Sequence, residues 1–200
     1  MNELEAKEEI RLIQEMIEKT RQSTAESGTL YFFWGIWIIL AIIGNYVLVW
    51  LEKYDWIWIN WVAFVLIGMA YSAFYSIRQE KKQATATYAQ IAARYLAMAC
   101  AVGFVLFGLV FPLLKVYSWE VIPPFIAVIA GIELFGVGGI YEWNLLKWSG
   151  AFWWIVSLAM LWVPANFRTL AFVPVIIVAY LLPGWVLRSN YQKSASRNDT

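Results

Sequence analysis

Residues 30–51 read LYFFWGIWIILAIIGNYVLVWL, a stretch without a charged side chain. A helix of about 20 apolar residues crosses the roughly 30 Å of hydrocarbon in a bilayer. The apolar residues are continuous rather than alternating, and an isolated strand would leave its backbone groups without partners in lipid. The stretch therefore predicts a transmembrane helix.

Five more apolar segments follow this one. Together, the predicted spans are 30–51, 56–77, 95–114, 121–140, 148–163 and 170–187, of which the fifth is the shortest. The connections are short except for 78–94, so neighbouring helices should pair as antiparallel hairpins. We expect an all-α polytopic membrane bundle of six transmembrane helices, with an amphipathic cytoplasmic helix over 1–28 and a polar tail over 188–200.

The composition agrees with this fold class and excludes several kinds of site. Apolar residues make up 62% and charged residues 14% of the chain, whereas soluble domains have about 45–50% and about 25%. The chain has no histidine and a single cysteine, Cys100, which excludes histidine-ligated metal sites, histidine catalysis and an internal disulfide. The net charge of +1 and the lack of a basic run or phosphate-binding loop argue against nucleic-acid partners. We therefore expect no enzyme, no metal and no cofactor.

The amino-terminal helix is acidic, with seven glutamates against four lysines and arginines over residues 1–28. This charge disfavours adsorption to anionic lipid. Ile10, Ile13 and Ile17 share one face at helical spacing, and Ser27-Gly28 is expected to end the helix. Three surfaces are alternatives as the contact of this apolar stripe: the membrane surface, the bundle itself and a partner protein. We favour packing on the bundle or on a protein partner.

The basic residues predict the orientation, because cytoplasmic loops carry an excess of lysine and arginine. Three of them, Lys53, Lys115 and Arg168, fall on one side of the predicted spans. The other twelve fall on the side of both termini: Lys7, Arg11, Lys19, Arg21, Arg78, Lys81, Lys82, Arg94, Lys147, Arg188, Lys193 and Arg197. Both termini are therefore expected in the cytoplasm.

Glu133 is the outstanding candidate for chemistry. It lies in AVIAGIELFGVGG, residues 127–139, with no other charge between Glu120 and Glu142. Ionisable groups inside a membrane are costly and are functional candidates. With no lysine or arginine at its depth, we expect a neutral carboxyl group that is hydrogen-bonded to serine, tyrosine or water.

Folding the neighbouring hairpins about their turns indicates what Glu133 meets. The residues expected near its depth are Val102, Gly103, Val156, Ser157, Tyr71 and Tyr180. The same folding pairs Arg94 with Glu142 at the inner interface. Two interpretations stay open: a proton or cation site made by Glu133, Ser157, Tyr71 and Tyr180, or a neutral acid that ties helices together.

Glycines and a proline suggest how the helices pack. The glycines around Glu133 are Gly131, Gly136, Gly138 and Gly139. Their spacing favours close packing of helices, and the alternative is a weakened helix end that moves. Pro183-Gly184 predicts a kink near the end of the last span, and the alternative is a broken helix at a transport site.

Three short motifs occur in order along the chain: FFWG at 32–35, WSG at 148–150 and PGWVL at 183–187. Together with the amino-terminal helix, they resemble a group of uncharacterised small bacterial inner-membrane proteins with about six spans. The resemblance implies a bacterial plasma-membrane location and an all-helical fold over nearly the whole chain. It implies no activity and no site residues.

Two hypotheses for the function follow. The first is a non-enzymatic accessory or regulatory component of the membrane that acts through protein contacts, with a partner protein or through self-association. The second is a small proton-coupled transporter or channel that uses Glu133. A membrane enzyme is the least favoured, because the glutamates, lysines and tyrosines do not assemble into a recognisable catalytic site.

Overall fold

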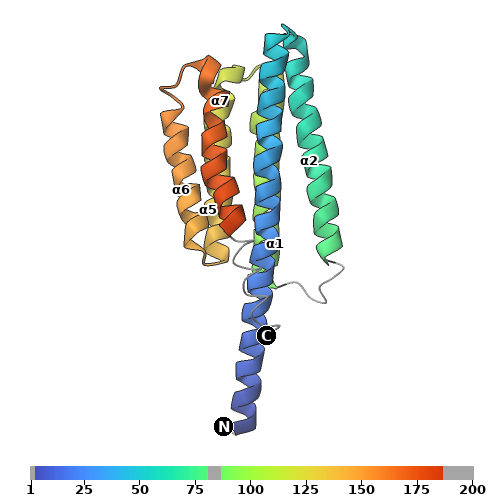
Figure 1. The fold of residues 1–200 in the computed structure, drawn as a ribbon, viewed down its shortest axis with the longest axis vertical. Helices are drawn as coiled ribbons and strands as arrows, with labels where there is room; N and C mark the ends of the chain where they lie inside the picture. Colours follow the sequence, from blue (N-terminus) through green and yellow to red (C-terminus); the bar gives the residue numbers. More distant parts are fainter. Residues whose placement is uncertain (1–2, 81–86, 187–200) are drawn as a thin grey trace.

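The computed structural model describes residues 3–80 and 87–186, and over 3–28 it describes the backbone with the side chains of Glu8 and Arg11 only. This part of the chain is all helical (Figure 1). The elements are α1 (Glu3–Trp50), η1 (Tyr54–Trp56), α2 (Ile57–Glu80), α3 (Tyr88–Val105), η2 (Leu106–Val110), α4 (Phe111–Leu113), η3 (Trp119–Val121), α5 (Ile122–Ile140), α6 (Asn144–Ala159), α7 (Ala165–Ile176) and η4 (Ile177–Leu181). The predicted tail and the side chains of Ile10, Ile13 and Ile17 lie outside the described residues.

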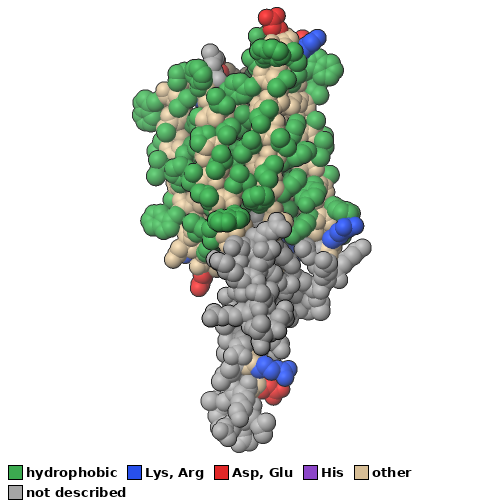
Figure 2. All heavy atoms as spheres, viewed as in Figure 1, with side chains coloured by type: hydrophobic (Ala, Val, Ile, Leu, Met, Phe, Trp, Pro, Cys, Tyr) green, Lys and Arg blue, Asp and Glu red, His purple; other side chains and the backbone are tan. Residues whose placement is uncertain are grey.

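These elements form consecutive antiparallel legs: α1, α2, α3–η2–α4, α5, α6 and α7–η4 (Figure 1). Five stretches are long and apolar enough to cross a membrane: Thr29–Trp50, Tyr54–Arg78, Tyr88–Leu113, Trp119–Ile140 and Phe167–Val186. Figure 2 shows apolar side chains covering the visible face of the bundle, with charged side chains at its ends. The all-helical fold is thus confirmed, and it indicates a multi-pass membrane protein.

The leg α6 is shorter and begins earlier than the predicted span at 148–163. It has 16 residues, about 24 Å of helix, against the roughly 30 Å of hydrocarbon in a bilayer. It begins early because the preceding turn is tight: Glu142 has a φ of 54°, and the N–H of Trp143 donates to the carbonyl of Gly138 at 2.7 Å. A sixth crossing therefore stays a prediction.

Helix α1 does not end where the sequence predicts. It runs unbroken through Ser27-Gly28 as a helix of 48 residues, about 72 Å long. A glycine inside a helix costs only about 1 kcal/mol, and without a proline the chain has no obligatory stop there. Figure 1 shows residues 3–28, which we call the arm, projecting beyond the rest of the bundle.

The legs place the arm and the end of the described chain at the same end of the bundle (Figure 1). We call this end the arm side and the opposite end the far side. The turns after α1, α4 and α6 lie on the far side, which carries Lys53, Lys115 and Arg168. There the guanidinium of Arg168 donates to the carbonyls of Val163 and Glu120, each at 2.8 Å, which fastens the α6–α7 loop to η3.

The closest packing joins α5 to α6 through glycines. A Cβ on Gly150 would lie 2.5 Å from the backbone N of Phe135 and 2.8 Å from the carbonyl O of Gly131. A Cβ on Gly138 would lie 2.6 Å from the backbone N of Lys147, whereas one on Gly139 would meet nothing within 4 Å. The backbones of the two helices therefore touch where a larger residue would hold them apart.

Helix α2 packs on a different face of α1, through polar contacts inside the membrane segment. The indole N–H groups of Trp34 and Trp37 donate to the hydroxyl of Ser72 at 2.9 Å and the carbonyl of Phe64 at 2.8 Å. A third bond joins the Asn60 amide to a carbonyl of α1 at 3.1 Å. These bonds position α2 beside α1, away from α5 and α6 (Figure 1).

Two buried prolines each follow a π-helical segment at the same spacing. In η2 the N–H of Phe111 donates to the carbonyl of Leu106, directly before Pro112. In η4 the N–H of Leu182 donates to the carbonyl of Ile177, directly before Pro183. Proline has no N–H to donate to the carbonyl four residues back, and its ring collides with that carbonyl. The wider π turn makes room for the proline ring. The helix therefore continues past Pro183 to residue 186 rather than ending there.

The glycine contacts predict a contrast between two equivalent substitutions. Gly150→Ala should destabilise the protein by about 1–3 kcal/mol, because its Cβ meets backbone atoms that cannot move cheaply. Gly139→Ala adds the same atom in open space and should leave the stability unchanged or slightly higher. Thermal unfolding in a mild detergent measures both, and equal melting temperatures for the two variants would contradict the packing of α5 on α6.

Candidate functional site

Glu133 lies in the middle of α5 and is half-buried. Gly136 lies directly against Leu96 of α3, so Arg94 is level with about Gly138 in this antiparallel pair. Glu133 is then about 7 Å deeper than Arg94, at 1.5 Å of rise per residue. Within the described spans no other charged residue lies as deep.

Side chains from three other legs lie near enough to this carboxyl group to interact with it electrostatically. Glu133 interacts electrostatically with Tyr31 of α1, Cys100 of α3 and Tyr180 of η4. The rings of Tyr31 and Tyr180 meet edge to face with centroids 5.9 Å apart, and Trp153 of α6 meets the Tyr180 ring in the same way, also at 5.9 Å. We call these five residues the carboxyl cluster.

The aromatic members of the carboxyl cluster are almost wholly buried. Tyr31, Tyr180 and Trp153 are 9%, 6% and 3% exposed. The indole N–H of Trp153 has no hydrogen-bond partner among the described residues. An unpaired buried donor costs about 1–3 kcal/mol, and such groups are rare in native structures. The cluster therefore combines the titratable carboxyl group of Glu133 with an indole N–H, that of Trp153, for which the described residues offer no acceptor.

Two local features bring Tyr180 against α1. A Cβ on Gly35 would lie 2.8 Å from Cδ2 of Leu181 and 3.3 Å from Cβ of Tyr180, so the glycine allows η4 to approach. The π turn of η4, which precedes Pro183, buries both Tyr180 and Ala179. Gly35 and Pro183 belong to the first and last of the three sequence motifs, and the structure places one against Tyr180 and the other directly after the turn that carries it.

The structure does not place Ser157 with Glu133. The hydroxyl of Ser157 donates to the carbonyl of Pro124 at 2.9 Å, and Pro124 is about 13 Å from Glu133 along α5. The reason is the register, because Gly131 of α5 lies against Gly150 of α6. Glu133 is therefore level with a part of α6 about two turns before Ser157.

Tyr71 also lies apart from Glu133. Its side chain is 41% exposed, and its ring stacks on Phe33 of α1 with centroids 4.1 Å apart. Phe33 is on the face of α1 that meets α2, whereas Gly35 is on the face that meets η4. Of the three predicted partners of Glu133, the structure therefore brings only Tyr180 to it.

The structure adds Tyr31, Cys100 and Trp153 to the site. Counting residues from the turn puts Val102 and Gly103 level with Glu133, but Gly103 lies against Ile129, with a Cβ there 3.3 Å from the Ile129 side chain. This register brings Cys100 to the level of Glu133 instead. All three added residues occur in uniformly apolar segments, so no pattern in the sequence distinguishes them.

The remaining candidates do not join the carboxyl cluster. Arg94 and Glu142 are both exposed, and the ion pair between them stays a prediction. No group of three histidine, cysteine, aspartate or glutamate side chains in the described part of the chain is arranged to hold a metal ion. A carboxyl group, two phenols, a thiol and an indole N–H can exchange protons and hydrogen bonds, and this is the chemistry that the cluster offers.

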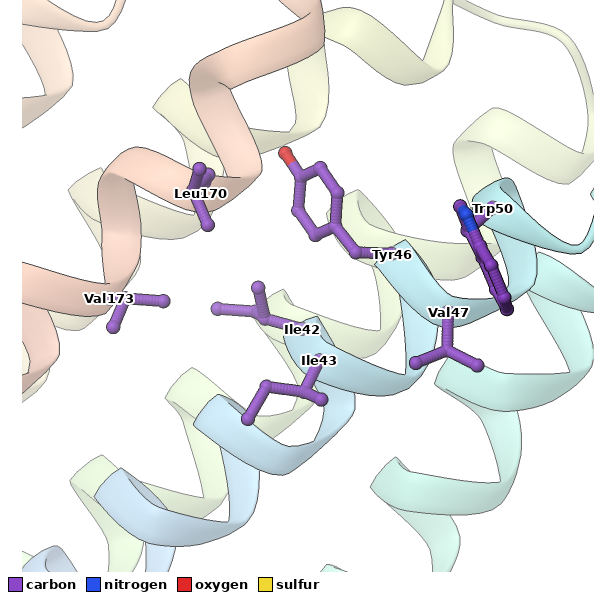
Figure 3. Close-up of a pocket in the computed structure, with 7 residues that line it drawn as sticks. All are labelled: Ile42, Ile43, Tyr46, Val47, Trp50, Leu170 and Val173. Atoms are coloured by element: carbon purple, nitrogen blue, oxygen red, sulfur yellow. The ribbon is translucent and has the colours of Figure 1, made fainter.

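A second feature is an apolar groove of about 310 Å³ between α1 and α7. Figure 3 shows Ile42 of α1 and Val173 of α7 pointing toward each other, with Val47 and Trp50 farther along α1. The residues that line the groove are Ile42, Ile43, Tyr46, Val47, Trp50, Leu170 and Val173. The groove opens on the outer surface of the bundle, and none of its lining residues is charged, so it offers a contact for hydrocarbon rather than a reactive site.

Comparison with protein-family models, with curated proteins and with solved structures found no match to this chain.

The composition of the carboxyl cluster predicts which variants disturb Glu133. Infrared spectroscopy of the reconstituted protein detects a protonated carboxyl group by its C=O band, and Glu133→Gln identifies the band by removing it. Tyr180→Phe should shift this band, because it removes a polar neighbour of Glu133. Ser157→Ala should leave the band in place, because the Ser157 hydroxyl is bonded to α5 about 13 Å away. A shift caused by Ser157→Ala alone would refute the register of α5 and α6.

Proposed function

We propose that this protein is a multi-pass component of a bacterial inner membrane, with both termini in the cytoplasm, that acts without catalysis through contacts with another protein. The observation that supports this most is the length of α1. Its 48 residues form about 72 Å of continuous helix, and a bilayer core needs only about 30 Å. The arm therefore carries a helical surface out of the lipid.

The course of the arm favours a partner over the bundle as its contact. Figure 1 shows the arm running away from the other legs rather than folding back on them. Ile10, Ile13 and Ile17 share one face by their spacing, and an apolar stripe on a projecting helix is suited to a groove or a second helix. The acidic character of the arm disfavours the alternative, adsorption to anionic lipid.

The distribution of basic residues supports the cytoplasmic orientation. Arg78, Arg94 and Lys147 lie near the arm side, as do the basic residues of the arm. Lys53, Lys115 and Arg168 lie on the far side. An excess of lysine and arginine on one side is typical of the cytoplasmic side. By sequence, twelve of these residues fall on the side of both termini and three fall on the other side.

Cross-linking in native membranes tests this proposal. An amine-reactive cross-linker should join a stoichiometric partner to Lys7 or Lys19 of the arm and not to Lys53 or Lys115, which offer the same chemistry on the far side. Replacing Ile10, Ile13 and Ile17 together by serine should abolish co-purification of that partner while the protein still inserts and stays monodisperse. Recovery of the protein without a partner, or a partner that tolerates the triple substitution, would contradict the proposed role of the arm.

A second function is supported by the carboxyl cluster. Glu133 is held at depth among buried tyrosines from two other legs, and intramembrane carboxyl groups of this kind mark proton and cation sites. We propose proton binding as the chemistry of this site, because the cluster has one acid, neutral phenols and no described second carboxylate that a metal cation requires.

Flux measurements decide whether this site supports transport. If the protein translocates protons through Glu133, proteoliposomes should show proton flux that Glu133→Gln abolishes, because glutamine keeps the shape and cannot exchange a proton. Glu120→Gln is the matched control, since Glu120 is exposed on the far side and its loss should leave the flux unchanged. Equal flux with and without the Glu133 carboxyl group would exclude the transport mechanism and leave the first proposal intact.

A further inference from the structure

The carboxyl cluster lies nearer to the arm side than to the far side. Helix α5 runs from Ile122 on the far side to Ile140 on the arm side. Glu133 is thus about 10 Å from the arm-side end of the helix and about 16 Å from its far-side end, at 1.5 Å per residue. A proton has the shorter route through the arm side.

A further tyrosine lies on the arm side of the carboxyl cluster. Tyr31, which interacts with Glu133, also interacts electrostatically with Tyr141. Tyr141 follows α5 directly and is half-buried at the arm-side edge of the core. Tyr31 therefore lies near both Glu133 and Tyr141, and Tyr141 lies toward the arm-side surface. A phenolic hydroxyl can both accept and donate a hydrogen bond.

The far side of the cluster is closed by apolar side chains. Buried residues of one hydrophobic core follow it in this direction, and they include Ile42, Ala127, Val156, Met160, Phe172 and Ile176. The one buried hydroxyl among the described residues there, that of Ser157, donates to the carbonyl of Pro124. We call these six residues the apolar plug, because a packed apolar layer of this kind is unfavourable for water and for a proton.

Every element packed around Glu133 contributes to its electrostatic surroundings. The titratable neighbours are Tyr31 from α1, Cys100 from α3 and Tyr180 from η4, with Tyr141 beyond Tyr31. From α6 the nearest described basic residue is Lys147, which lies against Gly138, about 7 Å farther along α5. The described residues therefore place a cation on the arm side of Glu133 and none in the apolar plug.

From this asymmetry we propose that Glu133 exchanges its proton with the arm side only, past Tyr31 and Tyr141, while the apolar plug closes the far side. A proton from arm-side water adds to the carboxylate oxygen to form the neutral acid, and the same O–H bond breaks when the proton returns. If a tyrosine hydroxyl relays the proton, it gains one and gives up its own, so it is unchanged afterwards. This inference rests on the proton site proposed above and adds the direction of access.

Sealed proteoliposomes test the direction of access. Vesicles with the arm outside are identified by cleavage of the arm with added protease, and their lumen is strongly buffered. Stepping the external pH should change the Glu133 carboxyl band in vesicles with the arm outside. In vesicles with the arm inside the band should stay constant until an ionophore equalises the pH. Glu133→Gln provides the baseline for both.

Each alternative result has a distinct meaning. A band that follows the far-side pH, or both sides equally, would overturn one-sided access and leave the proton site standing. A Glu133 band that never changes with pH on either side, even with ionophore, would overturn the proton site itself. Proton flux that Glu133→Gln abolishes would also overturn one-sided access, because flux requires exchange with both sides.

The route is tested by a pair of tyrosine variants. Tyr31→Phe should slow the band change after an arm-side pH step by roughly tenfold or more, since a positioned proton-transfer group contributes about a hundredfold or more to a rate. Tyr71→Phe is the matched control, because Tyr71 is also a tyrosine of a described span but stacks on Phe33, outside the carboxyl cluster. Equal rates in the two variants would remove Tyr31 from the route.

Discussion

The close approach of α5 and α6 at Gly131 and Gly150 is the contact on which the rest of the bundle depends. A lipid solvent gives apolar helices little reason to associate, so packing of backbone on backbone has to supply it. This contact sets the register of the two helices and with it the level of Glu133. The same register brings Trp153 inward to meet Tyr180 from η4.

Proline supplies the second constraint. Pro183 would be expected to disrupt the last leg, because it lacks an N–H and its ring collides with the preceding turn. The chain absorbs this in the π turn of η4, and this turn carries Tyr180 into the core opposite Gly35. A feature that looks like a kink in the sequence thus positions a residue of the carboxyl cluster.

Helix α1 connects the two functional proposals. It carries Tyr31 inside the bundle and the arm outside it, on one unbroken helix. Continuity follows from the weak helix-breaking power of Ser27-Gly28, since neither residue prevents the backbone hydrogen bonds from continuing. The arm is therefore continuous with one of the helices that form the carboxyl cluster.

The sequence by itself determined the all-helical fold class, five of the apolar spans and the position of Glu133 inside one of them. These depend on composition and on residue spacing along one helix, and both are local properties. Tertiary structure alone decided that Tyr31, Cys100 and Trp153 join Glu133 and that Ser157 and Tyr71 do not. Which residues meet across helices depends on register and rotation, and a shift of one turn exchanges every partner. That shift came from the tight turn at Glu142 and from the contact of Gly131 with Gly150, and neither can be read from an apolar run.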